Sequence, residues 1–194
     1  MPRIRSVCVY CGSSNRAPRE HRDAAIDLGR RLAEAGIELV YGGGHVGLMG
    51  AMAEAALEAG GRVTGIIPRD LIRREVGYGK VNRLIVTASM HARKMSMFRH
   101  SDAFVILPGG PGTLDEFFEV LTWRQLRFHD KPILLVESKG YWRPLLDLID
   151  WIIDHRYARP GFRRLFRVVP DVSKVVRALR AARRPRVKAR PRRL

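Results

Sequence analysis

The stretch Leu107-Pro-Gly-Gly-Pro-Gly-Thr-Leu-Asp-Glu116 joins an apolar run, residues 103–107, to an amphipathic run, residues 114–126. This order predicts a strand, a glycine-rich turn and the start of a helix. Glycine allows the backbone to approach a ligand closely, and a helix start offers unpaired N–H groups and the positive end of a dipole. We therefore interpret the turn as a phosphate site, with the carboxylate of Glu116 close to it.

Short apolar runs alternate with helical periodicity along the rest of the chain. Strands that alternate with helices of ten or more residues favour a parallel sheet with helices on both faces. We predict one α/β domain over residues 1–182 with a Rossmann-like, doubly wound parallel sheet. The predicted strands are residues 4–10, 37–41, 62–67, 83–87, 103–107, 132–137 and 167–169, and the predicted helices are residues 21–35, 46–59, 89–100, 113–128, 144–155 and 171–182.

Loops rich in glycine or serine follow three of these strands, at residues 11–15, 42–44 and 108–112. In such a sheet, ligands bind beyond the carboxyl ends of the strands. The second loop, together with Gly47, matches the Gly-x-Gly-x-x-Gly dinucleotide pattern. It follows the second strand rather than the first, and no acidic residue ends the next strand. We therefore expect no dinucleotide cofactor; these glycines either pack a helix against a strand or line a nucleotide site.

The composition is that of a globular protein. The chain has 194 residues, of which 46% are hydrophobic, and a formal net charge of +17. This length supports one sizeable core, and no window reaches the ~18–20 apolar residues of a membrane span. No signal-peptide pattern precedes the first strand. We expect a cytoplasmic protein with no membrane partner.

The positive charge is distributed unevenly along the chain. Residues 183–194 contain seven basic residues and no acidic one. A basic composition can indicate nucleic-acid binding, but no helix-turn-helix pattern or aromatic-interleaved platform accompanies it here. We predict a disordered basic tail over residues 183–194, and we keep nucleic-acid association through this tail only as a less favoured alternative.

Cys8 and Cys11 form an isolated Cys-x-x-Cys pair. Such a pair can be redox-active or bind a metal, but Cys8 lies inside an apolar run and the chain has no second pair. We interpret them as a buried strand residue and a loop residue. The six histidines and the carboxylates show no metal-ligand spacing, so we predict no metal and no cofactor.

Glu116 also has a purely structural interpretation. Thr113 and Glu116 are spaced as a capping box, in which each side chain would satisfy a backbone N–H at the helix start. The glycines at 109, 110 and 112 exceed what a cap needs, however, and the side chain of Glu116 would tilt towards the turn. Arg93 and Lys94 pose a similar choice, because cations near a helix start are poorly placed. Either a nearby anion compensates them or they are solvated surface charges.

A resemblance to a known family follows from these motifs. Ser89-Met-His-Ala-Arg-Lys94, with Ser101-Asp-Ala-Phe104 and the opening stretch, resembles the LOG ("Lonely Guy") family, whose Pro-Gly-Gly-x-Gly-Thr-x-x-Glu signature is matched in full. The similarity extends over residues 4 to about 155, and the basic tail has no counterpart. The other matching segments are Val9-Tyr-Cys-Gly-Ser-Ser14, Tyr41-Gly-Gly-Gly44, Gly47-Leu-Met-Gly50, Leu121-Thr-Trp123 and His129-x-Lys-Pro132.

LOG proteins are cytokinin-activating phosphoribohydrolases that were long labelled lysine decarboxylases. The resemblance implies a Rossmann-like homodimer that hydrolyses the N-glycosidic bond of adenosine 5′-monophosphate (AMP) or of an N6-modified AMP such as isopentenyl-AMP. The products would be the free base (cytokinin or adenine) and ribose 5-phosphate. It also implies that Arg93 and Glu116 are catalytic. The implied substrate contacts are Ser13, Gly43, Glu75, Met90, Lys94, Gly109, Gly110, Gly112, Thr113 and Thr122.

These residue types suit that chemistry. Glycosidic cleavage passes through an oxocarbenium-like transition state, which a carboxylate stabilises; a carboxylate can also activate water. Whether Glu116 acts as base or nucleophile stays open. Arg93 is always protonated, so we expect it to orient phosphate or ribose rather than donate a proton. A decarboxylase would need a lysine bound to pyridoxal phosphate, and Lys94 is the only lysine near the motif. A non-catalytic nucleotide carrier is the alternative.

Overall fold

The computed structural model describes residues 4–72 and 80–182, so the predicted basic tail and Glu75 lie outside the described residues. Seven strands form one sheet in the order β4-β3-β2-β1-β5-β6-β7, and every neighbouring pair is parallel. The doubly wound parallel sheet predicted from the sequence is confirmed. The strands are β1 (Ser6–Tyr10), β2 (Glu38–Tyr41), β3 (Val63–Pro68), β4 (Arg83–Thr87), β5 (Ala103–Ile106), β6 (Ile133–Val136) and β7 (Arg167–Val169).

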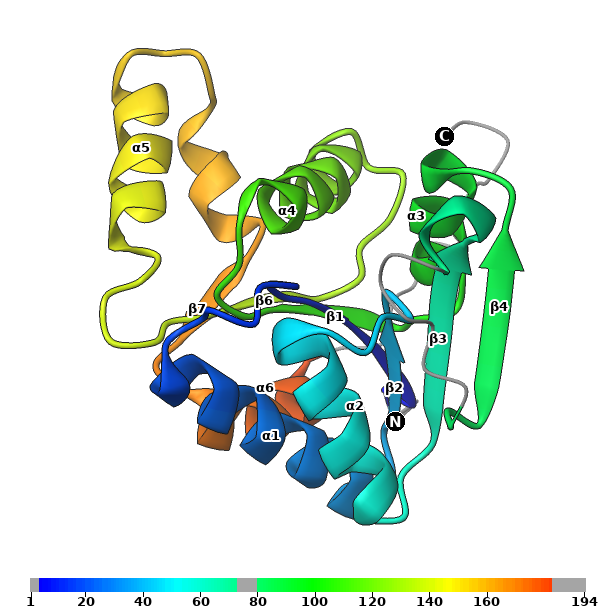
Figure 1. The fold of residues 1–194 in the computed structure, drawn as a ribbon. Helices are drawn as coiled ribbons and strands as arrows, with labels where there is room; N and C mark the ends of the chain where they lie inside the picture. Colours follow the sequence, from blue (N-terminus) through cyan, green and yellow to red (C-terminus); the bar gives the residue numbers. More distant parts are fainter. Residues whose placement is uncertain (1–3, 73–79, 183–194) are drawn as a thin grey trace.

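Helices cover both faces of this sheet (Figure 1). The helices α1, α2 and α6 lie on one face, and α3, α4 and α5 lie on the other. Two buried apolar clusters fill the spaces between the sheet and its two helical layers. The α-helices are α1 (Arg19–Glu34), α2 (Gly47–Glu58), α3 (Met90–Arg99), α4 (Pro111–Gln125), α5 (Arg143–Asp154) and α6 (Val175–Ala181), and the 3₁₀ segments are η1 (Arg69–Leu71), η2 (Pro160–Arg164) and η3 (Val172–Lys174).

The strand order reverses between β1 and β5, which lie side by side at the centre of the sheet. The helices that follow these two strands, α1 and α4, therefore lie on opposite faces of the sheet, and a crevice is expected at the carboxyl ends of the strands, where α/β proteins bind ligands. A hydrogen bond joins the loops, because the Gly12 N–H donates to the Pro108 carbonyl at 3.0 Å. The glycine-rich turn after β5 thus faces the Cys-Gly-Ser loop after β1.

The start of α4 differs from the sequence prediction. The helix begins at Pro111, with Gly110 as its N-cap, rather than at Thr113. Proline suits the first helical position because it has no N–H to leave unpaired. Thr113 therefore lies inside the first turn, and the capping-box interpretation of Thr113 and Glu116 is wrong. The segment predicted as a final helix from residue 171 is also divided, into η3 and α6.

The His129-x-Lys-Pro132 segment lies under α3 and α4. The Lys131 N–H donates to His129 Nδ1 at 3.1 Å, so Nε2 carries the proton and donates to the Val120 carbonyl at 2.8 Å. Burial lowers the pKa of His129 to about 4 and that of Lys131 to about 8. The Lys131 ammonium donates to the Phe98 carbonyl and lies 3.9 Å from the centre of the Phe98 ring. These side chains hold α3 and α4 against the sheet.

The described part of the chain contains no helix that is both long enough and apolar enough to cross a membrane.

Candidate active site

A cavity of about 280 Å³ lies at the carboxyl ends of β1 and β5. The loop after β1 and the first turn of α4 form two of its walls, and the starts of α2 and α3 and the end of η1 complete it. The lining residues are Cys11, Gly12, Ser13, Met49, Leu71, Met90, Arg93, Gly110, Pro111, Gly112, Thr113, Asp115 and Glu116.

Most of the predicted site residues meet in this cavity. Those that line it are Ser13, Met90, Arg93, Gly110, Gly112, Thr113 and Glu116. Gly43, Lys94, Gly109 and Thr122 are outside the lining, and Glu75 is outside the described residues. The fold thus brings together both predicted catalytic residues and half of the predicted substrate contacts.

The first turn of α4 presents its backbone to the cavity. Within the described chain, no side chain caps this helix. Pro111 has no N–H, so the first helical N–H groups belong to Gly112 and Thr113, which both line the cavity. A helix start of this kind binds phosphate through its N–H groups and its dipole. The geometry therefore supports the phosphate site predicted at this turn.

Arg93 is a buried residue of α3, with only 5% of its surface exposed. Its Nε donates to the Ile66 carbonyl at 3.1 Å, and its Nη2 donates to the Gly42 carbonyl at 2.9 Å. The alternative of a solvated surface charge is wrong for this residue. The ends of β2 and β3 hold the guanidinium in place, so that a fixed positive charge lines the cavity.

The glycines that match the dinucleotide pattern have packing roles around this cavity. A Cβ atom on Gly42 would lie 2.1 Å from Nη2 of Arg93. Gly47 has a φ of +61°, and a Cβ there would lie 2.4 Å from the Ser13 carbonyl carbon. The Gly47 N–H also donates to Asn15 Oδ1 at 2.8 Å. Gly42 therefore allows the guanidinium of Arg93 to approach the end of β2, and Gly47 allows the loop after β1 to pack against the start of α2.

Lys94 links α3 to α4. Its Nζ lies 3.1 Å from Oδ2 of Asp115 and 3.0 Å from Oε1 of Glu119. Partial burial alone would lower the pKa of Lys94, but its hydrogen bonds to Glu119 and Asp115 outweigh that cost and raise it. The anion that compensates this cation is thus supplied by α4. A substrate contact through Lys94 stays a prediction.

Glu116 lies on α4 and is half-buried in the cavity wall. Burial, and to a smaller extent the Glu116 carboxylate, raises the pKa of the Cys11 thiol well above its usual value; the same two causes raise that of Cys8. Both cysteines are buried and unbridged, which fits their interpretation as strand and loop residues. Among the residues at 4–72 and 80–182, no group of three His, Cys, Asp or Glu side chains could hold a metal ion.

Tyr141 is a functional candidate that the sequence did not indicate. It follows β6, and its hydroxyl donates to the Gly109 carbonyl at 2.8 Å. Its ring packs edge-on against His21, with ring centroids 5.1 Å apart. The bond holds the glycine-rich turn just before the start of α4. No motif marks this contact, since the two residues are 32 positions apart.

The fold is that of a Rossmann-like α/β protein, and its cavity combines a helix start, a buried arginine and a carboxylate. Residues 49–179 match the family model described as possible lysine decarboxylase. The chain is 45% identical to "Cytokinin riboside 5′-monophosphate phosphoribohydrolase LOG5" of Arabidopsis thaliana, over 92% of this chain and 78% of that protein. It is 46% identical to the probable phosphoribohydrolase LOGL9 of Oryza sativa subsp. japonica, over 91% of this chain and 78% of that protein. The chain belongs to the LOG family.

Solved structures share the fold. A protein titled TM1055 aligns with a TM-score of 0.70 and 28% identity, over 90% of this chain and 98% of that one. The molybdenum cofactor carrier protein of Chlamydomonas reinhardtii aligns with a TM-score of 0.67 and 23% identity, over 91% of this chain and 96% of that one. The second likeness concerns the fold alone.

We expect Tyr141→Phe to weaken substrate binding without unfolding the protein. A typical hydrogen bond contributes about 0.5–1.5 kcal/mol, so loss of the bond to Gly109 should raise the KM for the nucleotide about 2–12-fold. The kcat should change less than the KM. Steady-state kinetics measure both values, and Tyr157→Phe, at a residue that is 84% exposed, is the control. An unchanged KM would show that the turn keeps its position without this bond.

Proposed function

We propose that this chain is a phosphoribohydrolase that cleaves the N-glycosidic bond of an adenosine-type nucleoside 5′-monophosphate. The products are the free base, a cytokinin or adenine, and ribose 5-phosphate. One observation carries the proposal: Arg93 and Glu116, from two different helices, line one cavity together with the uncapped start of α4. A relative that is 45% identical over most of the chain is named for this activity, and one that is 46% identical is named as a probable enzyme of this kind.

The cavity suggests how the residues divide the work. The 5′-phosphate is bound by the N–H groups of Gly112 and Thr113. Glu116 stabilises the positive charge that develops on the ribose as the bond to the base breaks, or activates the attacking water. Arg93 stays charged throughout and orients the phosphate or the ribose. The cavity is also lined by the apolar side chains of Met49, Leu71 and Met90. These side chains suit contact with the base and with an apolar group on its N6 atom.

Two other functions fit the chain less well. A non-catalytic carrier would use the same loops to bind a nucleotide, but it would not need both Arg93 and Glu116 in one cavity. A decarboxylase would need a lysine that forms a Schiff base. The ammonium of Lys94 is held by two carboxylates. Lys131 has a lowered pKa but lies under α3, outside the cavity lining.

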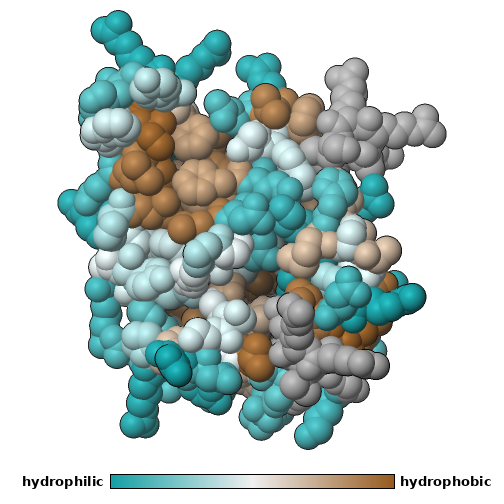
Figure 2. Space-filling model, turned by 45° about the horizontal axis from the view of Figure 1, so that its top comes forward, coloured by the Kyte–Doolittle hydropathy of each residue, from teal (hydrophilic) through white to brown (hydrophobic). Residues whose placement is uncertain are grey.

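A homodimer is part of the proposal. The resemblance assigns a substrate contact to Thr122, which is exposed on α4 and absent from the lining of this chain's own cavity; a second copy could bring its own Thr122 to that cavity. Figure 2 shows an apolar area at its upper left, over the region of α4 and α5, and Leu148 and Trp151 of α5 are exposed. Such areas are typical of interaction surfaces. Light scattering would measure the mass in solution and so distinguish a dimer from a monomer.

We also propose that the protein is located in the cytoplasm.

The test is a substrate panel. The purified chain is incubated with AMP, isopentenyl-AMP, GMP and CMP, and the release of free base is followed by chromatography. We expect adenine or isopentenyladenine to be released together with ribose 5-phosphate. Binding of these nucleotides without release of base would instead favour the carrier function. Comparison of AMP with isopentenyl-AMP would show whether the apolar wall residues favour an N6 substituent.

A further inference from the structure

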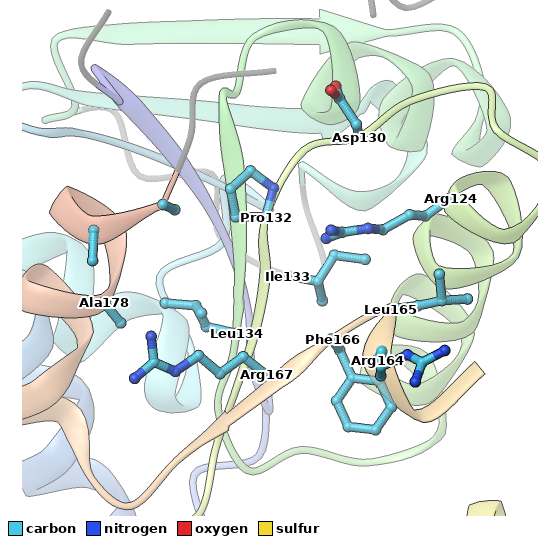
Figure 3. A pocket seen from close by; sticks show the side chains of 12 residues that line it. Arg124, Asp130, Pro132, Ile133, Leu134, Arg164, Leu165, Phe166, Arg167 and Ala178 are labelled. Carbon is cyan, nitrogen blue, oxygen red and sulfur yellow. The ribbon is translucent and has the colours of Figure 1, made fainter. Parts of the chain in front are cut away.

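A second, larger cavity of about 470 Å³ lies far from the active site, at the amino ends of β6 and β7 (Figure 3). The C-terminal part of α4, the end of η2 and the end of α6 complete its walls. None of the described residues that line it belongs to the lining of the active site. The catalytic proposal therefore gives this cavity no role.

Arginines dominate the polar lining of this cavity. Arg124, Arg164 and Arg167 line it. An adjoining cavity of about 540 Å³ shares Arg124 with it and adds Arg127 and Arg159. We call the two cavities together, with these five arginines, the basic groove. Among the described residues that line the groove, only Asp130 is acidic.

The charges of the arginines in the basic groove are not neutralised by ion pairs within the described residues. Within residues 4–72 and 80–182, no ion pair involves any of the five, whereas the neighbouring Arg163 is paired with Asp150 at 3.2 Å. Arg124 is half-buried and donates to the Lys131 carbonyl at 2.8 Å. Burial lowers the pKa of Arg124, and Asp130 offsets this only in part. A partly dehydrated guanidinium whose charge is only partly offset by a carboxylate is stabilised further by a bound anion.

The arrangement of these charges indicates the shape of the anion. In Figure 3, Arg124, Arg164 and Arg167 come from different elements, and their guanidinium groups lie on different sides of the cavity instead of meeting at one point. A single phosphate would need converging donors. Charges that are spread along a groove suit a ligand that carries several phosphates in a row. The exposed side chain of Leu126 and the half-buried side chains of Phe162 and Leu165 line the adjoining cavity, and they offer an apolar surface to unpaired bases.

We propose that the basic groove binds single-stranded nucleic acid, as a second function independent of base release. The five arginines contact backbone phosphates, and the apolar side chains contact bases. Because the site is concave and is lined by both cationic and apolar side chains, an unpaired strand fits it better than a duplex does. The sequence argued against a nucleic-acid partner because it shows no helix-turn-helix pattern and no aromatic-interleaved platform. These arginines are spread over residues 124–167, so they form a groove only in the fold.

The test measures binding of a fluorescein-labelled 12-nucleotide single-stranded RNA to the full chain by anisotropy, over a range of salt concentrations. Each phosphate contact contributes a slope of about −0.7 to the plot of log K against log salt for a single strand, so five contacts predict a slope of about −3.5. In the triple variant R159S/R164S/R167S, we expect the slope to weaken by about 2 and the affinity to fall at every salt concentration. The control variant R22S/R30S/R99S removes three other exposed arginines and should bind as the parent does.

Other outcomes would overturn the proposal. If the groove variant binds RNA as tightly as the control variant does, the affinity comes from another basic part of the chain. If a duplex of the same length binds as well as the single strand, or if excess AMP displaces the RNA, the groove does not hold an unpaired strand at a separate site. Both variants should keep the base-release rate of the parent, which tests folding independently of RNA binding.

Discussion

Replacement of Glu116 by glutamine is expected to lower the rate of base release by about 10²–10⁴-fold, the range that a positioned acid or base contributes. The change keeps the size of the side chain and removes only its charge. Glutamine neither stabilises an oxocarbenium-like transition state by charge nor activates water. The affinity for AMP should stay the same or increase, because one negative charge near the 5′-phosphate is lost. Chromatography of released adenine and calorimetric titration with AMP measure the two effects.

Asp115→Asn provides the matched control for this variant. Asp115 precedes Glu116 on α4 and lines the same cavity. The substitution Asp115→Asn removes the same negative charge as Glu116→Gln does. Asp115 is the more exposed of the two carboxylates and already bonds Lys94, so we expect a far smaller loss of activity from Asp115→Asn. Equal losses in the two variants would mean that the cavity needs only general negative charge. A fully active Glu116→Gln enzyme would remove Glu116 from the mechanism.

The fold was predictable from the sequence because its signals are local. Each strand is an apolar run that ends in a turn, and each helix repeats its apolar residues with the helical period. Element boundaries were less accurate where two signals competed. At α4, Thr113 and Glu116 suggested a capping box, but the rigid Pro111 after Gly110 starts the helix two residues earlier. That shift matters for function, because it places Glu116 further into the helix, on the cavity wall.

The active site was predictable only in part. The motif around residues 107–116 identified the turn and the carboxylate, and the resemblance supplied Arg93. The contacts that hold these groups depend on residues far apart in the sequence, and no local pattern records them. Tyr141 reaches Gly109 across 32 positions, and Arg93 reaches the Gly42 carbonyl across 51. The basic groove was missed for the same reason, since its arginines are ordinary surface charges when considered one by one.

Gly42→Ala is expected to lower kcat/KM by about 10²–10³-fold, although Gly42 is not part of the cavity lining. The added methyl group would lie 2.1 Å from Arg93 Nη2, so the guanidinium must leave its bond to the Gly42 carbonyl and move. Loss of one fixed charge-stabilising donor costs about 10²–10³-fold in well-studied sites. Arg93→Lys should cause a similar loss, because lysine lacks the planar fork that bonds two carbonyls at once.

The double variant Gly42→Ala/Arg93→Lys decides whether the glycine acts through the arginine. If the methyl group harms activity only by displacing the guanidinium, it has little left to displace once lysine replaces arginine. The double variant should then be no less active than Arg93→Lys alone, which is strong non-additivity between residues in contact. Gly161→Ala, where the nearest atom to the new methyl group is 3.6 Å away, should keep full activity. Additive losses would instead mean that the methyl group distorts the end of β2 itself, so that the glycine shapes the strand rather than the position of Arg93.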